Sequence, residues 1–316
     1  MNKRDIQLLK DLCAIHAPSG SESAVKEFLI EYVNENSSNW KVQPKLIHGE
    51  NFQDSLILVF GKPTCAIYAH MDSVGYSVGY NNDLIKIGGP KAEEGTVLIG
   101  EDSKGKIKAK LHYQIEDETE DHKVINTVLQ FDRLVDRGTT LIYQPNFIES
   151  DNYIQNCYLD NRLGIWNALK VAETLENGAI AFSCWEEVGG GSVGYLAKHL
   201  YENYKIRQAL IADITWITEG VQHGKGVAVS MRDSGIPRRS FIDKIIGLTR
   251  DSGIDFQLEV ESAGGSDGNA LQKSPFPIDW CFIGAPEDNV HMPTEKVHKH
   301  DIECMHKLYS YLLNNL

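Results

Sequence analysis

Hydrophobic residues along the first 75 positions follow two periods, one typical of helices and one typical of buried strands. Apolar residues recur at helical spacing from Asp5 to His16, and again in a second segment that Ser21 or Ser23 can cap. Short apolar runs then predict three strands, the last of which stops at His70. Their expected ranges are Lys41–Ile47, Ser55–Phe60 and Cys65–Ala69.

The segment from Tyr76 to Asn156 shows short strand-like runs separated by glycine and charged turns, and its pattern predicts no helix. Such a pattern is typical of a small β-barrel or β-sandwich, here inserted into an α/β domain. Its acidic run, Glu116–Asp121, is expected at a solvated loop tip. The expected strands are Leu84–Ile87, Thr96–Ile99, Lys106–His112, Lys123–Leu129 and Thr139–Tyr143.

After residue 156 strands and helices alternate again, which is the pattern of an α/β domain. We therefore predict one α/β domain built from residues 1–75 and 157–316, interrupted by a β-domain over residues 76–156. The expected helices are Leu163–Leu175, Ser192–His199, Phe241–Arg250, Asn269–Gln272 and Asp301–Leu313. The expected strands are Ala179–Cys184, Gln208–Ala212, Val227–Ser230, Phe256–Val260 and Ile278–Ile283.

Two adjacent carboxylates, Glu186 and Glu187, follow the apolar run 178–184, where a buried strand is expected to stop. Neighbouring side chains on a strand point to opposite sides, but in the turn after it both can reach one cavity. One carboxylate can then bind a metal ion while the other handles protons. A pair of this kind standing alone is usually a solvated acidic turn, so other residues must decide its role.

Five residues with metal-ligand chemistry lie at or just beyond the ends of predicted strands. The carboxyl ends of strands in an open α/β sheet line one crevice, so these side chains are expected to converge. Two histidines and three carboxylates suit zinc, cobalt or manganese better than calcium or magnesium. Five ligands are too many for one tetrahedral ion but fit two ions that share a carboxylate. The five are His70, Asp160, Glu187, Asp213 and His291.

Three other residues with metal-ligand or hydrogen-bonding side chains lie near these positions. Asp72 lies two residues after His70 and can accept the second ring N–H of that histidine, although a turn or capping role is the alternative. His298 and His300 follow His291 closely and are expected at the surface before the last helix.

The composition narrows the classes of partner. A formal charge of −13 and a pI near 5.3 argue against nucleic acid or an anionic membrane. The N-terminal residues lack the apolar core of a secretory signal, and no apolar run approaches the length of a membrane span. The six cysteines lie singly and without CxxC spacing, which predicts reduced core thiols in a cytoplasmic protein.

Several segments, spread in order over nearly the whole chain, resemble the glutamyl/deblocking aminopeptidases. These are dinuclear metallopeptidases that form tetrahedral assemblies, and some have also been named cellulases or endoglucanases. Leu-Asp-Asn-Arg at 159–162 together with the double Glu is the specific part of the resemblance, whereas His-Met-Asp at 70–72 is weaker. The matching segments are Ala17–Gly20, Ala69–Gly75, Leu159–Gly164, Glu186–Gly189, Gly264–Asp267 and His291–Glu295.

The resemblance implies a mixed-sheet, three-layer peptidase domain of the phosphorylase/hydrolase kind, with the inserted β-barrel domain serving assembly and substrate access. It also implies two divalent metal ions per subunit, zinc or cobalt before manganese, bridged by Asp160. His70 and Asp213 would complete one metal site, and Glu187 and His291 the other.

The same resemblance implies that Glu186 is the general base and that a cis peptide bond follows Asp160. With Asp72 fixing a histidine ligand, Glu186 and Asp72 are the expected catalytic residues. The expected assembly is a homo-oligomer of up to twelve subunits whose interior admits short peptides.

Three departures from the family pattern concern substrate recognition. The family usually has an acidic residue at Ser73, Gln at Trp185, and an Arg-aromatic stretch at Pro286–Val290. The sequence thus predicts a metallo-aminopeptidase that acts on short peptides. Two rivals stay open. One is a metal-dependent amidohydrolase or deacylase of small N-acyl amino acids, and the other is a metal-free homologue without catalysis, against which the intact ligand set speaks.

Overall fold

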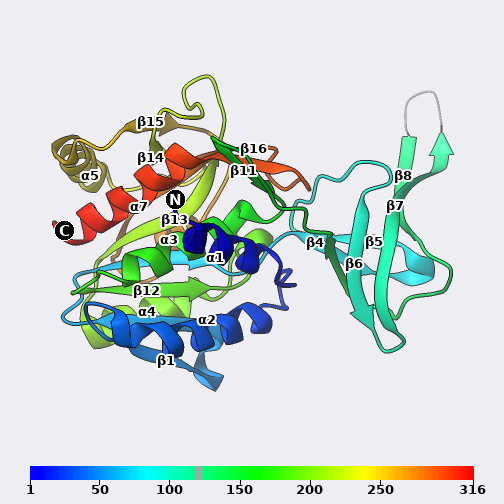
Figure 1. The fold of residues 1–316 in the computed structure, drawn as a ribbon, viewed down its shortest axis with the longest axis horizontal. Helices are drawn as coiled ribbons and strands as arrows, with labels where there is room; N and C mark the ends of the chain where they lie inside the picture. Colours follow the sequence, from blue (N-terminus) through cyan, green and yellow to red (C-terminus); the bar gives the residue numbers. More distant parts are fainter. Residues whose placement is uncertain (119–122) are drawn as a thin grey trace.

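The computed structural model describes the backbone of residues 1–118 and 123–316 and the side chains of residues 1–114 and 126–316. Figure 1 shows a large α/β body and a smaller group of strands that projects from one side of it. The prediction of a mixed α/β fold is therefore confirmed. The side chains of the acidic run Glu116–Asp121, predicted as a solvated loop tip, lie outside the described residues.

The body is organised around a large mixed sheet. Its four central strands β12, β3, β13 and β16 run parallel to their neighbours in this group, while β2 and β17 continue the sheet in antiparallel pairing. The strands along this path are β1 (Lys45–Gly49), β2 (Gln53–Phe60), β12 (Gly178–Ser183), β3 (Cys65–His70), β13 (Gln208–Trp216), β16 (Asp279–Asp288), β17 (Glu295–His298), β11 (Tyr153–Asn156) and β10 (Ile148–Glu149). Two more strands branch from this path: β14 (Val227–Arg232) pairs with β16, and β15 (Phe256–Val260) pairs with β14.

Helices cover both faces of this sheet, which explains why its central strands are apolar throughout. Along β2, Leu56, Leu58 and Phe60 join one hydrophobic cluster, whereas Ile57 and Val59 join another on the opposite face. The first cluster includes residues of α1 (Lys3–Cys13), α2 (Ser23–Asn36), α3 (Leu159–Ala172), α5 (Arg239–Ser252) and α7 (Lys299–Leu313). The second includes residues of α4 (Val193–Tyr204) and α6 (Asp267–Lys273).

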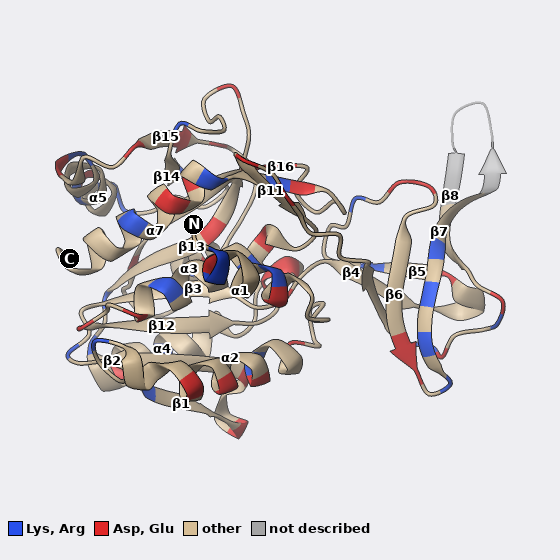
Figure 2. Cartoon of the chain, in the orientation of Figure 1, with Lys and Arg blue, Asp and Glu red and all other residues tan. Residues whose placement is uncertain are grey.

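The projecting unit is a six-stranded antiparallel sheet with its own hydrophobic cluster. An isolated bridge between Asp83 and Val128 brings the two ends of this sheet together, so that it is nearly closed into a barrel. Lysines alternate with buried apolar residues along one of its strands, and Figure 2 shows them as bands on β7. The six strands are β4 (Gly75–Val78), β5 (Leu84–Ile87), β6 (Val97–Asp102), β7 (Gly105–Glu118), β8 (Lys123–Gln130) and β9 (Thr140–Tyr143).

The structure differs from the predicted elements at several boundaries. Strand β13 continues to Trp216, so Asp213 lies inside a strand and not beyond its end. Glu22 precedes α2 without any side-chain capping bond, so the predicted cap by Ser21 or Ser23 is wrong. The last strands of the expected insertion, β10 and β11, pair with the large sheet.

The cysteines and the helices bear on two further predictions from the sequence. All six cysteines are free and buried, as expected for core thiols. Among the helices of the described residues, none combines the length and the apolar character needed to cross a membrane.

Candidate metal centre and active site

The five side chains predicted as metal ligands lie together at one rim of the large sheet. His70 ends β3, and Asp213 lies in the neighbouring strand β13. Asp160 occupies the kinked start of α3, where the peptide bond to the next residue is cis, as the resemblance implied. Glu187 lies in the 3₁₀ turn after β12, and His291 lies between β16 and β17.

Asp160 stands between two groups of ligands and turns one carboxylate oxygen toward each. Its Oδ1 is 3.2 Å from Nε2 of His70, and that nitrogen is 3.5 Å from Oδ2 of Asp213. Its Oδ2 is 3.3 Å from Nε2 of His291, which is 3.2 Å from Oε2 of Glu187. The geometry thus forms two three-ligand groups that share one carboxylate.

The spacing of these atoms fits divalent cations. Zinc binds nitrogen and oxygen ligands at about 2.0–2.2 Å, so two ligands of one tetrahedral ion lie roughly 3.3–3.6 Å apart. The measured separations of 3.2–3.5 Å are close to this range. In addition, Oε1 of Glu187 is buried and has no hydrogen-bond partner among the described residues, as expected of an oxygen that serves a cation.

The electrostatics of the centre also favour added positive charge. Burial, reinforced by the charge of Asp160, raises the pKa of Glu187 to about 7. Burial likewise raises the pKa of Asp213 to about 6. Burial works to lower the pKa of His291, but hydrogen bonds to Asp160 and Glu187 outweigh it and raise that pKa to about 11. Protons or divalent cations are needed to offset the clustered carboxylates.

Glu186 enters the same cavity from the first position of the 3₁₀ turn Glu186–Val188. Its Oε2 lies 4.0 Å from Nε2 of His70. Burial, reinforced by the charges of Asp213 and Glu187, raises the pKa of Glu186 well above its ordinary value. A carboxyl group in this position can take up a proton and return it.

Asp72 connects His70 to the turn that carries the two glutamates. Its Oδ1 is 3.4 Å from Nδ1 of His70. Its two carboxylate oxygens also accept the backbone N–H groups of Glu186 and Glu187, each at 3.1 Å. Ser19 donates its hydroxyl to the same carboxylate at 2.6 Å. Asp72 therefore holds the glutamate turn as well as the histidine ring, which is more than its sequence position indicated.

Comparison with known proteins then decides the family. The sequence model of the M42 glutamyl aminopeptidase family matches residues 58–308, a range that contains the five candidate ligands, Glu186 and Asp72. This chain belongs to the M42 family. The predicted resemblance is thus confirmed, and so is the prediction of an enzyme that hydrolyses peptides as an aminopeptidase.

Solved structures of archaeal aminopeptidases share the M42 fold seen here. An aminopeptidase from Desulfurococcus kamchatkensis matches with a TM-score of 0.83 at 20% identity, covering 99% of this chain and 95% of that one. The TET1 peptidase of Pyrococcus horikoshii matches with a TM-score of 0.78 at 22% identity, covering 98% and 99%. A relative from Acetivibrio thermocellus, whose name assigns it only provisionally as an aminopeptidase, is 25% identical over 341 residues, 98% of each chain.

Glu295 supports the M42 centre in a way that the sequence analysis missed. Its Oε2 accepts the backbone N–H of Asp160 at 3.2 Å, and its Oε1 accepts the backbone N–H of His291 at 3.1 Å. Glu295 is itself buried. Glu295 is the last residue of the motif at 291–295. Its position close to the candidate ligand His291 is the sequence signal that could have identified it.

A loop from the six-stranded sheet also reaches the centre without any signal in the sequence. The carbonyl oxygen of Gly89 is 3.2 Å from Nδ1 of His291, a residue 202 positions later. The backbone N–H of Lys91 donates to the carbonyl of His291 at 2.9 Å, and the hydroxyl of Tyr143 donates to the same carbonyl at 3.1 Å. The smaller sheet thus helps to orient a candidate ligand.

Two of the residues that depart from the family pattern, Ser73 and Trp185, lie outside the lining of the cavity. Ser73 is buried and donates its hydroxyl to the carbonyl of Ala17 at 3.2 Å. Trp185 precedes the glutamate turn in a left-handed conformation, and its backbone N–H donates to Oε1 of Glu22 at 3.2 Å. Among the described residues that line the cavity, neither departure appears.

Proposed function

We propose that this M42 peptidase is a dinuclear metallo-aminopeptidase that removes N-terminal residues from short peptides. The observation that carries the proposal is Asp160, whose two oxygens face His70 at 3.2 Å and His291 at 3.3 Å. A carboxylate placed between two ligand groups suits a bridge between two ions. His70 and Asp213 would hold one ion, and Glu187 and His291 the other. The donor set suits zinc or cobalt, with manganese as the alternative.

Divalent ions bound there would supply Lewis acidity toward the scissile carbonyl and would lower the pKa of the attacking water. Glu186 takes the proton of that water on its carboxylate and gives it to the leaving amine. The raised pKa of Glu186 suits this exchange, because the group can hold the proton between the two transfers. Asp72 keeps Glu186 in place through the backbone hydrogen bond at 3.1 Å.

A substrate comparison tests this proposal against an amidohydrolase on the same scaffold. We expect peptides and aminoacyl reporters with a free α-amine to be cleaved, because the carboxylate-rich cavity favours an ammonium group. Acetylation of that amine removes its charge and should lower kcat/KM by about 10- to 100-fold, the worth of a charge-assisted hydrogen bond. Preference for the acetylated compounds would favour the amidohydrolase instead. Activity that persists after thorough metal removal would contradict the metal dependence.

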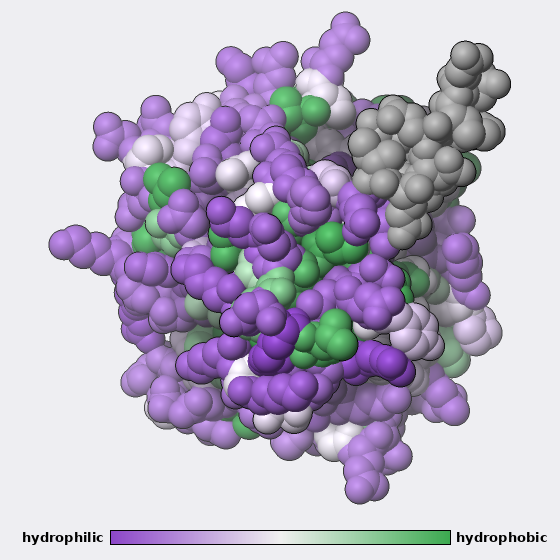
Figure 3. Space-filling model, turned by 90° about the vertical axis from the view of Figure 1, so that its right-hand side faces the viewer, coloured by the Kyte–Doolittle hydropathy of each residue, from purple (hydrophilic) through white to green (hydrophobic). Residues whose placement is uncertain are grey.

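We also propose that the chain forms a homo-oligomer through an inserted domain over residues 76–156, within a body that has the three-layer peptidase architecture. The TET1 peptidase is described as assembling into a tetrahedron or a large octahedral shell. In this chain the surface at the smaller sheet carries apolar patches (Figure 3), and Tyr80, Ile85 and Leu134 are each more than 60% exposed. Light scattering tests the proposal, which a monomeric mass would contradict.

A cytoplasmic location is a further proposal, supported by the six free, buried cysteines. Cell fractionation tests it, and recovery of the protein outside the cell would refute it.

A further inference from the structure

We infer that the cavity beside the metal centre selects substrates whose N-terminal residue is lysine or arginine. The inference rests on the proposed function, because it names the side chain that the aminopeptidase prefers. The cavity has a volume of about 210 Å³. Seven carboxylates line it, and among the described residues of its lining there is neither a lysine nor an arginine.

Three of these carboxylates have no part in the proposed metal centre. Asp233 follows β14, Glu259 lies in β15, and Glu261 comes just after that strand. Asp233 and Glu259 are 7% and 3% exposed. The hydroxyl of Thr215 donates to Glu259 and helps to fix its direction. Burial raises the pKa of both carboxyl groups, so a cation placed beside them would favour their ionised forms.

The proposed metal centre does not neutralise the charge of these three groups. Asp160, Glu187, Asp213 and one hydroxide would already balance two divalent ions. The charge of Arg232 on β14 works to lower the pKa of Asp233, but its Nε donates to the backbone oxygen of that residue at 3.2 Å and not to the carboxylate. A positively charged substrate side chain would therefore provide the missing charge.

The lining of the cavity suits a long side chain with a charged end. Its walls include Ile214, Trp216 and Phe282, which can pack against the aliphatic stem of lysine or arginine. A glutamate side chain would meet like charges instead. This chain is thus expected to prefer basic residues although its family is described by glutamyl activity.

Three reporters that differ only in the N-terminal residue test the inference. Lysyl and norleucyl reporters share the same carbon stem, so their ratio isolates the terminal ammonium group, and a glutamyl reporter gives the opposite charge. We expect kcat/KM to fall in the order lysyl, norleucyl, glutamyl. In Glu259→Gln the lysyl-to-norleucyl ratio should fall by about 10- to 100-fold, because only the lysyl reporter loses a charge-assisted hydrogen bond. Asp233→Asn and Glu261→Gln test the other two carboxylates, and Glu219→Gln, at an exposed position outside the cavity, is the matched control.

Two results would overturn the inference. One is a ratio that stays unchanged in all three cavity variants, or a preference for the glutamyl reporter. The other is an equal loss for lysyl and norleucyl reporters, because the carboxylates would then bind the α-ammonium group common to both. If no reporter were cleaved, the proposed function would fail, and calorimetry with lysinamide and norleucinamide would still decide the inference. Equal binding of these two amides by the wild-type protein would refute it.

A second cluster carries an independent inference. We propose that Asp255, His300 and Cys304 bind a thiophilic divalent ion such as zinc or cobalt, away from the catalytic centre. His300 and Cys304 lie one turn apart on α7 and share a face of that helix. Asp255 comes from the segment between α5 and β15, where its carbonyl accepts the backbone N–H of Val227 at 3.2 Å.

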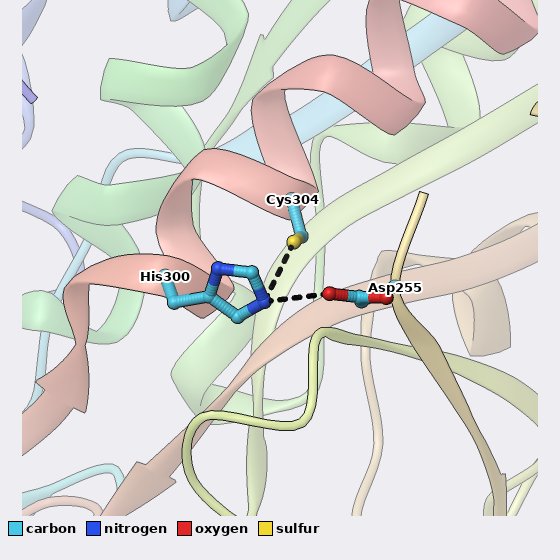
Figure 4. A group of neighbouring side chains, drawn as sticks. All are labelled: Asp255, His300 and Cys304. Carbon is cyan, nitrogen blue, oxygen red and sulfur yellow. Dashed lines mark hydrogen bonds and ion pairs between the residues drawn. The ribbon is translucent and has the colours of Figure 1, made fainter. Parts of the chain in front are cut away.

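The three side chains converge on one point, as Figure 4 shows. Nε2 of His300 is 3.0 Å from Oδ2 of Asp255 and 3.5 Å from Sγ of Cys304. All three potential ligand atoms lie within 4.8 Å of one another. Zinc binds nitrogen at about 2.0–2.1 Å and thiolate sulfur at about 2.3 Å, which places such ligands roughly 3.5 Å apart. Three protein ligands leave the fourth tetrahedral position to water.

A His–Asp ion pair by itself involves only two of the three side chains. The carboxylate of Asp255 accepts a hydrogen bond only when Nε2 of His300 carries a proton. A thiol of Cys304 donates to the same nitrogen only when that proton is absent. A cation held between the three atoms satisfies all of them at once, with the thiol proton released on binding.

Cobalt binding tests this site separately from catalysis. A thiolate ligand gives Co²⁺ a near-ultraviolet charge-transfer absorption, which the His and carboxylate ligands of the catalytic centre cannot give. We expect this absorption in the wild-type protein and in Cys65→Ala, a control that removes another buried cysteine. It should be lost in Cys304→Ala and in His300→Ala. Its absence from the wild type, or its persistence in either of these two variants, would overturn the proposal.

Discussion

Replacement of Glu186 by glutamine should lower kcat by about 10²- to 10⁴-fold, the usual contribution of a positioned acid–base group. The metal content should stay at the wild-type level, because Glu186 lies outside the two three-ligand groups. Glutamine keeps the size of the side chain and the backbone N–H bond to Asp72 but cannot carry the proton. Steady-state kinetics together with metal analysis of the same preparation measure both effects.

The neighbouring substitution Glu187→Gln is the matched control, since it alters a carboxylate of the same turn. It should lose metal from the group that contains His291, whose Nε2 is 3.2 Å from Oε2 of Glu187. If Glu186→Gln lost its metal, or kept full activity, the division of roles within the pair would be wrong.

The second large effect is expected for Asp160→Ala, which should remove both metal ions and abolish activity. Each oxygen of Asp160 faces a different ligand group, so its loss leaves both groups with only two ligands. By contrast, Asp213→Ala should affect only the group that contains His70. Metal analysis after dialysis compares the two variants. If Asp160→Ala retained one full equivalent of metal, Asp160 would be an ordinary ligand of a single site.

The sequence could predict that the five candidate ligands meet, because the chemistry of each residue and its place in the hydrophobic pattern are both local properties. His70 ends a fully buried strand, and Glu187 follows another, so their convergence at one rim could be expected from the topology of parallel strands. Asp213 was placed less well, since β13 stays buried beyond it as far as Thr215. The sequence did not indicate the end of β13, because apolar and small residues continue past Asp213.

The supporting contacts could not be predicted, because they depend on how distant segments pack. Gly89 has no reactive side chain, and its carbonyl contributes only because the smaller sheet brings that loop beside His291. Glu295 had a suitable residue type, but nothing local indicates that its two oxygens would accept the N–H groups of both Asp160 and His291. The end of the insertion was hidden for the same reason, since β10 and β11 pair with the large sheet through partners far along the chain.

Stepwise metal addition to metal-depleted wild-type protein tests the central claim most directly. Hydrolysis of a peptide with a free α-amine is measured as zinc or cobalt is added, and bound metal is counted in parallel. Because Asp160 serves two ligand groups, the account predicts that activity returns with metal and that binding saturates at two equivalents per subunit, apart from any ion held by Cys304. Full activity of the metal-depleted protein, or saturation at a single equivalent, would contradict it.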